Sequence, residues 1–387
     1  MMKKESSDRL ARVGIVTYIR SANYGSALQA FALQEHVASL GYDACLVDWL
    51  DPTNHRNKIE RIRHIASQLL WTIRAPRASL SLRLNTGYSH MQSQEKREAF
   101  SAFEQRCLRY SSGDYARPGV FDAFICGSDQ VWSLSMPGLH RTFFLRFAQE
   151  SRRISYAPSF GTDVVPRHNR RILARYLNGM AHISVREHSG VHIVKEATGR
   201  DVPCVLDPVL LVGKEFWLKK IARIPKATER PYVVTYLLSD NNPAVEYARQ
   251  QAAMLSSRLV WIESGVRAPE GAETVTPDPV EFVSLIADAD MVVTDSFHGL
   301  AFSLLLNRPF TIINRAYESN GAQSTRIQSL MELTTGWGGA ADGVIRYQVE
   351  KNSGFDWHGV NSSLEKEQEE SRRYLASALE DVCKGGR

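Results

Sequence analysis

Short apolar runs alternate with longer amphipathic stretches along the first part of the chain. Residues 13–17 form the first apolar run, and a polar, glycine-containing turn separates them from residues 27–40, where apolar side chains recur at helical spacing. Further apolar runs typical of strands lie at 44–47, 121–126, 154–157, 183–185 and 204–206. This alternation predicts a mainly parallel sheet with helices on both faces.

The same alternation starts again after residue 225. Strands are predicted at 232–238, 259–262, 274–275, 291–294 and 310–313, and a helical pattern at 280–287 lies between the third and the fourth of them. We therefore predict an α/β fold of two Rossmann-like domains, at residues 12–224 and 225–362. A charged amphipathic stretch at 364–382 predicts a closing helix within residues 363–387.

A long insertion, at about residues 54–115, separates the second and third predicted strands. Its early part, 59–84, mixes several arginines with apolar side chains that include Trp71. A basic amphipathic helix of this kind can lie on an anionic membrane surface. The alternative is a helix that packs on its own domain and keeps its arginines in water, as many helices of soluble proteins do.

Composition narrows the class of protein. With 387 residues and 43% hydrophobic residues, the chain can bury a core in each of two domains. No apolar run approaches the roughly 18 residues that cross a bilayer, and the first ten residues are charged, unlike a signal peptide. We therefore expect a cytoplasmic protein, with peripheral contact at the inner face of the membrane as the alternative.

The net charge of +5 suits an anionic small molecule, a phosphate-bearing lipid or nucleic acid. The sequence has no basic block interleaved with stacking aromatics and no helix–turn–helix or zinc-finger signature. No nucleic-acid partner is therefore predicted.

Polar clusters follow the predicted strands repeatedly. They lie at 21–26, 127–132, 158–161, 186–189 and 295–299. In doubly wound sheets, ligands bind beyond the carboxyl ends of the strands. The clusters therefore predict one binding site built from several loops.

Within these clusters His298, Asp129 and Arg186 are the sharpest candidates for chemistry. His298 follows a strand at a helix start, where backbone N–H groups can hold an anionic substrate. Asp129 either acts on the substrate or caps a helix. Arg186 either contacts the substrate or forms a structural ion pair with Glu187 or Asp207.

Several common active-site motifs are missing from the sequence. There is no G-x-x-x-x-G-K-[ST] loop, no G-x-S-x-G elbow and no complete G-x-G-x-x-G after the first strand. His188 and His192 have helical metal-ligand spacing but lack an H-E-x-x-H context and a third ligand nearby, so no metal site is predicted. An ordinary nucleotide hydrolase, serine esterase or dinucleotide dehydrogenase is thereby disfavoured.

Taken together, the clusters resemble the polysaccharide pyruvyl transferase family. The resemblance spans roughly residues 13–333 and rests on the order and spacing of several motifs. The motifs are Val-Gly-Ile-Val-Thr at 13–17, Asn-Tyr-Gly-Ser-Ala-Leu-Gln-Ala at 23–30, Phe-Asp-Ala-Phe-Ile-Cys-Gly-Ser-Asp-Gln-Val-Trp at 121–132, Ser-Val-Arg-Glu at 184–187, Leu-Asp-Pro at 206–208 and Asp-Ser-Phe-His-Gly at 295–299. Ser296 is one departure, because several family members carry arginine there.

The resemblance implies a fold similar to the GT-B glycosyltransferases, with two Rossmann-like domains facing a cleft. It also implies transfer of a pyruvyl group from phosphoenolpyruvate to two hydroxyls of a sugar. Such a reaction forms a cyclic ketal and needs no cofactor beyond phosphoenolpyruvate as the donor substrate. The candidate catalytic residues are Asp129, Arg186 and His298. Substrate binding is predicted for Asn23, Tyr24, Gly25, Ser26, Gln29, Gly127, Ser128, Gln130, Trp132, Ser159, Glu187, Asp295, Ser296, Phe297, Gly299 and Arg326.

The charges of these residues fit such a donor. Its carboxylate and phosphate need cationic or backbone donors, which Arg186, Arg326 and the helix start at Gly299 can supply. His298 is the expected acid or base, and Asp129 is expected to orient or deprotonate the acceptor.

The expected partners are phosphoenolpyruvate and a glycan acceptor, either free or lipid-linked. A GT-B glycosyltransferase that uses a nucleotide sugar remains the alternative enzyme. A sugar- or lipid-binding module without catalysis is the alternative from another class.

Overall fold

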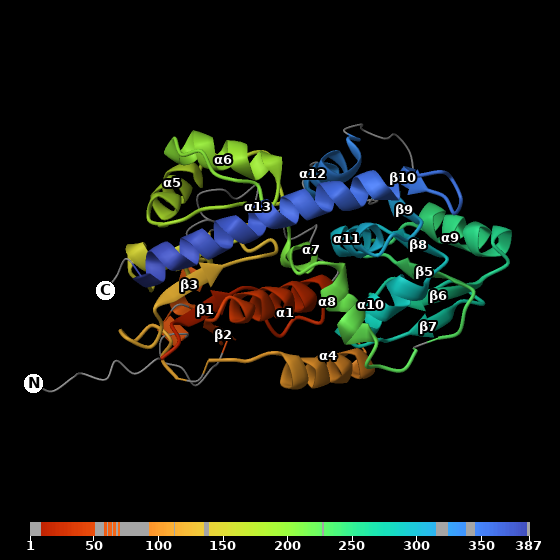
Figure 1. Cartoon of the computed structure of the whole chain (residues 1–387), viewed down its shortest axis with the longest axis horizontal. Coiled ribbons are helices and arrows are strands. Elements are labelled where there is room, and N and C mark those ends of the chain that lie inside the picture. Colours follow the sequence, from red (N-terminus) through yellow and green to blue (C-terminus); the bar gives the residue numbers. More distant parts are fainter. Residues whose placement is uncertain are drawn as a thin grey trace, which may run out of the picture.

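The computed structural model describes residues 9–50, 58–59, 61–63, 65–66, 69, 93–111, 113–134, 139–226, 228–314, 324–337 and 345–384. Two sheets lie side by side in this part of the chain (Figure 1). We call the residues up to 226 the N-terminal half and residues 228–349 the C-terminal half. The predicted α/β class with two Rossmann-like units is confirmed, because the sheets are almost entirely parallel and helices pack on them.

The sheet of the N-terminal half has the strand order β2–β1–β3–β4, with every pair parallel. The strands are β1 (Arg12–Val16), β2 (Asp43–Leu46), β3 (Ala123–Cys126) and β4 (Arg153–Ser155). Most of their residues are apolar and buried because helices cover both faces. The strands predicted at 183–185 and 204–206 are joined by one isolated bridge, Val185 to Cys204, and His182, just before the first of them, bridges to Ile154.

The sheet of the C-terminal half has the order β10–β9–β8–β5–β6–β7. Its strands are β5 (Tyr232–Tyr236), β6 (Arg258–Ile262), β7 (Glu273–Val275), β8 (Met291–Thr294), β9 (Phe310–Ile313) and β10 (Ile345–Val349). The predictions for 291–294 and 310–313 are confirmed. The sequence prediction missed β10, an antiparallel strand that pairs only with β9 and mixes polar with apolar residues.

Helices connect the strands and join the halves. They are α1 (Tyr24–Ser39), α4 (Gln94–Cys107), α5 (Arg170–Asn178), α6 (His188–Thr198), α7 (Pro208–Leu211), α8 (Lys214–Ile221), α9 (Asn242–Met254), α10 (Pro279–Asp288), α11 (Phe297–Leu305), α12 (Ser324–Thr335) and α13 (Trp357–Lys384), with short 3-10 turns at Arg141–Phe144 and Glu150–Arg152.

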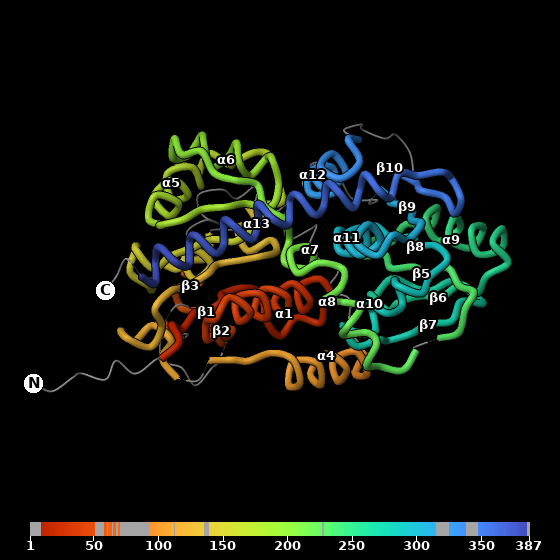
Figure 2. The backbone as a smooth tube through the Cα atoms, in the orientation of Figure 1, coloured from red at the N-terminus to blue at the C-terminus, as the bar shows by residue number. Residues whose placement is uncertain are grey.

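The closing helix α13 begins at Trp357, earlier than the predicted start at 363. Its early residues Val360 and Leu364 belong to the core beside the second sheet. Farther along, Leu375 and Leu379 pack against the first sheet. The helix thus crosses both halves, as the backbone trace shows (Figure 2).

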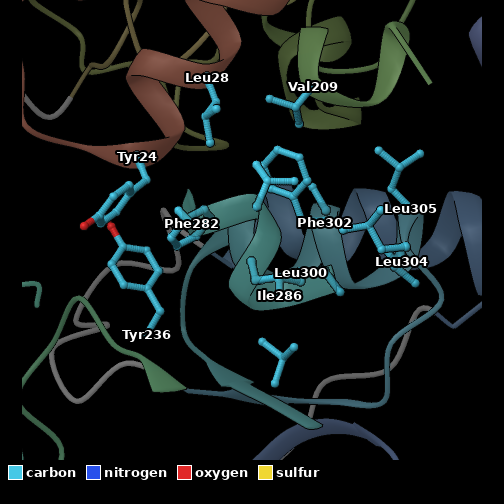
Figure 3. Packing of buried hydrophobic residues seen from close by; sticks show 14 of the residues in the cluster. Tyr24, Leu28, Val209, Tyr236, Phe282, Ile286, Leu300, Phe302, Leu304 and Leu305 are labelled. Atoms are coloured by element: carbon cyan, nitrogen blue, oxygen red, sulfur yellow. The ribbon is translucent and has the colours of Figure 1, made fainter. Parts of the chain in front are cut away.

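A continuous apolar core fills the junction between the halves. Leu28 of α1 and Val209 of α7 meet Phe282 of α10 and Phe302 of α11 there (Figure 3). The Tyr24 ring stacks on Phe282 at 4.5 Å between centroids. Because residues of both halves share one core, the halves are held together by packing.

The insertion also reaches across this junction. Its described helix α4 packs on α10. At the start of α4, Ser93 Oγ donates to Glu263 Oε2 at 2.6 Å, and near its end Arg106 lies 2.6 Å from Asp278. Trp71, the tryptophan of the predicted basic helix, lies outside the described residues. Within the described part of the chain, no helix is long and apolar enough to span a bilayer.

Candidate functional site

A cavity of about 380 Å³ opens beyond the carboxyl ends of β1, β3 and β8. The N-terminal half contributes the loops after β1 and β3 and the first turn of α1. The C-terminal half contributes the loop after β5 and the starts of α11 and α12. The described lining residues are Tyr18, Ser21, Asn23, Ser26, Asp129, Gln130, Leu238, Ser296, Phe297, His298 and Arg326.

Asp129 is held in the cavity wall by hydrogen bonds to both carboxylate oxygens. Ser26 Oγ donates to Oδ2 at 2.6 Å, and the Gln130 N–H donates to Oδ1 at 2.8 Å. Burial alone would raise the Asp129 pKa, but Arg186, His298 and the Ser26 hydroxyl lower it below its ordinary value. Asp129 is therefore an anion at neutral pH.

The loop that carries Asp129 has an unusual backbone. The Gly127–Ser128 peptide bond is cis, and Gly127 has a φ of +119°. A Cβ at Gly127 would lie 2.1 Å from the Tyr156 carbonyl oxygen, so only glycine fits there. Gln29 Oε1 accepts the Ser128 N–H at 2.9 Å. Gly127, Ser128 and Gln29 thus shape the loop and do not line the cavity.

Arg186 occupies a buried position behind the cavity wall. Its Nη1 pairs with Asp207, and its Nη2 lies 3.8 Å from Asp129 Oδ1. Burial would lower the Arg186 pKa, but the two carboxylates raise it above its ordinary value. The structure therefore favours the alternative of an ion pair with Asp207 over direct substrate contact. Arg186 also stacks on Phe297, with its guanidinium 4.6 Å from the ring centre.

Asp207 is the site residue whose importance the sequence prediction missed. It caps α7, where its Oδ1 accepts the Val209 N–H at 3.1 Å. Its Oδ2 accepts Ser128 Oγ at 2.9 Å and lies 3.7 Å from His298 Nε2. An Asp–Pro pair at a helix start is a common structural cap, which is why the sequence alone did not single out its second role.

His298 enters the site on the first turn of α11. Ser296 caps this helix, with the Gly299 N–H 3.5 Å from its Oγ. Asp295 is bonded to the Leu238 N–H and to Ser239 Oγ, both at 2.7 Å, so it fixes the turn. His298 is only 6% exposed, and in the described part of the chain its Nε2 has no hydrogen-bond partner.

Arg326 and Tyr18 complete the cavity wall. Arg326 projects from α12, is largely buried and lies 5.9 Å from the Phe297 ring centre. Tyr18 was not predicted, since it only follows the first apolar run. Its hydroxyl donates to the Gln130 carbonyl at 3.2 Å. Burial, with Asp129 nearby, raises the Tyr18 pKa, so the phenol stays neutral.

Several residues predicted to bind substrate lie in core or supporting positions. Trp132 is fully buried, stacks on Phe144 and donates its indole N–H to the Phe143 carbonyl at 2.8 Å. Tyr24 is equally buried, and its hydroxyl donates to the Pro277 carbonyl at 3.0 Å. The predicted residues that do not line the cavity are Tyr24, Gly25, Gln29, Gly127, Ser128, Trp132, Ser159, Arg186, Glu187, Asp295 and Gly299.

Ser159, Glu187 and Gly299 are supporting residues for recognisable reasons. Glu187 Oε1 accepts Ser159 Oγ at 3.0 Å and the Phe160 N–H at 2.8 Å, which ties two loops together. A Cβ at Gly299 would lie 2.6 Å from Thr294 Oγ1, so glycine lets α11 start close to β8. Sequence position alone cannot tell such residues from those that face the cavity.

The cavity therefore presents a carboxylate, an imidazole and a guanidinium to one space. A fixed carboxylate can orient a hydroxyl group, an imidazole can exchange protons, and a guanidinium can hold a phosphate or carboxylate. Among the residues that the structure describes, no group of three or more His, Cys, Asp or Glu side chains is arranged to hold a metal ion.

Residues 23–317 match the family model described as polysaccharide pyruvyl transferase. No curated protein sequence matches the chain significantly. Among solved structures, the chain is similar to a UDP-N-acetylglucosamine 2-epimerase from Rickettsia bellii at 11% identity, with a TM-score of 0.46 over 96% of this chain and 98% of that chain. It is also similar to the glycosyltransferase SnogD from Streptomyces nogalater at 12% identity, with a TM-score of 0.42 over 97% and 100%. Structural similarity of this degree carries no argument about activity.

Proposed function

Because the chain belongs to the polysaccharide pyruvyl transferase family and is a transferase, we propose that it transfers the pyruvyl group of phosphoenolpyruvate to two hydroxyls of one sugar residue in a glycan. The product is a cyclic ketal. The observation that carries this proposal is the shared cavity, where Asp129 of the N-terminal half meets His298 and Arg326 of the C-terminal half.

The donor fits the charge of the cavity wall. Phosphoenolpyruvate carries a carboxylate and a phosphate, and Arg326 is the cavity-lining arginine among the described residues. Backbone N–H groups at the start of α11 add donors for an anion. The charge of Arg186 is balanced by Asp129 and Asp207, so Arg186 stabilises these two carboxylates and does not hold the donor.

The reaction needs proton transfers that balance. The methylene carbon of the donor takes a proton, and C2 then accepts the oxygen of the first hydroxyl, which loses its proton. Phosphate leaves C2 with the electron pair of its bond, and the second hydroxyl adds to C2 and loses its proton. One of the two hydroxyl protons balances the proton of the new methyl group, and the other leaves with phosphate or solvent.

His298 suits the role of the group that moves protons, because an imidazole can act as acid and base in turn. Asp129 suits a different role. Its lowered pKa makes it a weak base but a good hydrogen-bond acceptor, so it orients the acceptor hydroxyls. The reaction scheme requires no metal or further cofactor, because the developing phosphate charge can be balanced by arginine and backbone donors.

A direct test is to incubate the protein with phosphoenolpyruvate and a panel of glycans, and to measure phosphate release together with a new ketal carbon by NMR. Stoichiometric phosphate and ketal would support the proposal. Phosphate release without a ketal would reduce the activity to hydrolysis. Glycosyl transfer from a nucleotide sugar in the same panel would replace the proposal by the glycosyltransferase alternative.

The acceptor we propose is lipid-linked and reached at the cytoplasmic face of a membrane. In the insertion, Ile59, Ile62 and Leu69 are exposed apolar residues close to one helical face, beside the exposed cation Arg61. Such a face suits an anionic bilayer. Flotation with anionic vesicles should retain the protein at low salt and release it at high salt. No flotation with anionic vesicles at low salt would make the acceptor a free glycan.

A further inference from the structure

We propose that Asp207 and Gly25, both in the N-terminal half, position His298 of the C-terminal half by holding the two edges of its imidazole ring. The proton-transfer group of one half is then set in place only when the other half is docked on it. The effect on turnover rests on the proposed function, whereas the positioning itself can be tested without any substrate.

The first edge of the ring faces Asp207. His298 Nε2 lies 3.7 Å from Asp207 Oδ2, which is longer than a hydrogen bond but well within electrostatic range. The same Oδ2 is fixed by Ser128 Oγ at 2.9 Å and by Arg186, so the carboxylate cannot turn away. Asp207 is 1% exposed, which removes the screening by water.

A fixed anion at this place decides where the imidazole carries its proton. A hydrogen on Nε2 points toward the carboxylate and is stabilised by it, whereas a lone pair there would be repelled. On the neutral ring Nδ1 is then the nitrogen that carries the lone pair and can accept a proton. The other charged groups around the ring are Asp129 on the loop after β3, Arg186 behind it and Arg326 on α12.

The second edge of the ring lies against Gly25. A Cβ at Gly25 would come within 1.9 Å of His298 Nδ1 and 2.3 Å of its Cε1. Gly25 lies in the first turn of α1, where the helical backbone would accept alanine. Glycine is thus required at this position by the imidazole of the other half, not by its own backbone.

The contact can be tested by a double-mutant cycle on thermal unfolding, with Gly25→Ala, His298→Ala and the double variant. In the wild-type background, Gly25→Ala should lower the Tm because the new methyl group collides with the ring. In the His298→Ala background the collision is gone, and alanine should raise the Tm or leave it unchanged because it favours helix over glycine. Equal Tm changes in both backgrounds would show that Gly25 does not position the His298 ring.

Asp207→Asn tests the other edge. Asparagine keeps the size and the helix cap but removes the charge. In ¹⁵N NMR of the full chain, the His298 ring should change from the Nε2–H form in the wild type to a mixture of tautomers in the variant. With phosphoenolpyruvate and an acceptor, we expect kcat to fall about 100-fold while KM for the donor changes less than about threefold.

Asp290→Asn is the matched control. Asp290 is also a buried carboxylate paired with cations, Arg230 and Lys351, but it lies away from the cavity. Its loss should lower the Tm and leave the His298 ring spectrum and kcat unchanged. An unchanged ring spectrum in Asp207→Asn would overturn the role of Asp207. If the wild-type chain shows no turnover, the proposed function fails, yet the Tm cycle and the ring spectrum still decide the positioning.

Discussion

On the N-terminal side of the cavity, both carboxylate oxygens of Asp129 and of Asp207 accept hydrogen bonds from residues of the same half. On the C-terminal side, His298 reaches across the junction, and within the described chain its Nε2 has no hydrogen bond. The first wall is therefore organised by its own half, whereas the second depends on how the halves dock. Fixing the two anions in advance thus takes a dense buried network within one half, whereas the position of the proton carrier is set by contacts with the other half.

The largest expected effect comes from removing the proton carrier. His298→Ala should lower kcat by about 1000-fold or more, since a positioned acid or base contributes that order of rate. The fold should survive, because no hydrogen bond to Nε2 is lost. Steady-state kinetics with a circular dichroism control checks this, and near-normal turnover would remove His298 from the reaction.

A smaller loss of kcat is expected when Asp129, on the N-terminal side of the cavity, is replaced. Asp129→Asn should reduce kcat by about 100-fold, because the neutral amide orients the acceptor hydroxyls poorly. The amide oxygen can still accept one of the two hydrogen bonds that hold Asp129, either from the Ser26 hydroxyl or from the Gln130 N–H. If the variant fell as far as His298→Ala and recovered with added formate, Asp129 would be a base and not an orienting group.

Arg326 should affect binding more than the chemical step. Arg326→Ala should raise KM for phosphoenolpyruvate about tenfold or more, consistent with the loss of one charge-assisted contact. A twofold or smaller change in KM, or a fall in kcat alone, would place the donor anion elsewhere in the cavity. Kinetics at several donor concentrations separates these outcomes.

Acid should destabilise the N-terminal side of the cavity, where Asp129 and Asp207 are held as anions. Burial opposes ionisation of Asp207, but Arg186 and His298 lower its pKa below the ordinary value, and the Asp129 pKa is also lowered. The folded state therefore binds these protons less readily than the unfolded state, and the stabilisation is lost as pH falls from about 4 toward the lowered pKa values. Unfolding free energies between about pH 5 and about pH 3 should fall less steeply in Asp207→Asn than in the wild type. Equal slopes would mean that Asp207 is not stabilised as an anion.

The smallest effect concerns a residue that the structure moves out of the site. Tyr24→Phe loses the hydrogen bond to the Pro277 carbonyl and should cost about 1 kcal/mol of unfolding free energy. Because Tyr24 packs in the junction core, kcat and KM should not change. Denaturant unfolding measures the loss of stability, and steady-state kinetics measures kcat and KM. A raised KM would return Tyr24 to the substrate site.

The sequence was informative about where the site lies and less so about which side chains face it. Strand ends can be read from apolar runs, so the sequence predicts that Asp129 and His298 belong to one binding site. It could not show that Trp132 turns into the core while Gln130 faces the cavity, because the turn at 127–130 has a backbone that no periodicity predicts. The sequence offered Asp207 only as an ionic partner of Arg186, because nothing in the spacing of residues shows that it lies 3.7 Å from His298 of the other half.

Isothermal titration measures whether the cavity binds phosphoenolpyruvate, on which the proposed function depends. The wild-type chain should bind phosphoenolpyruvate with one site per chain, Arg326→Ala should bind it more weakly, and uridine and guanosine diphosphates should give no heat. Binding of a nucleoside diphosphate without binding of phosphoenolpyruvate would contradict the account.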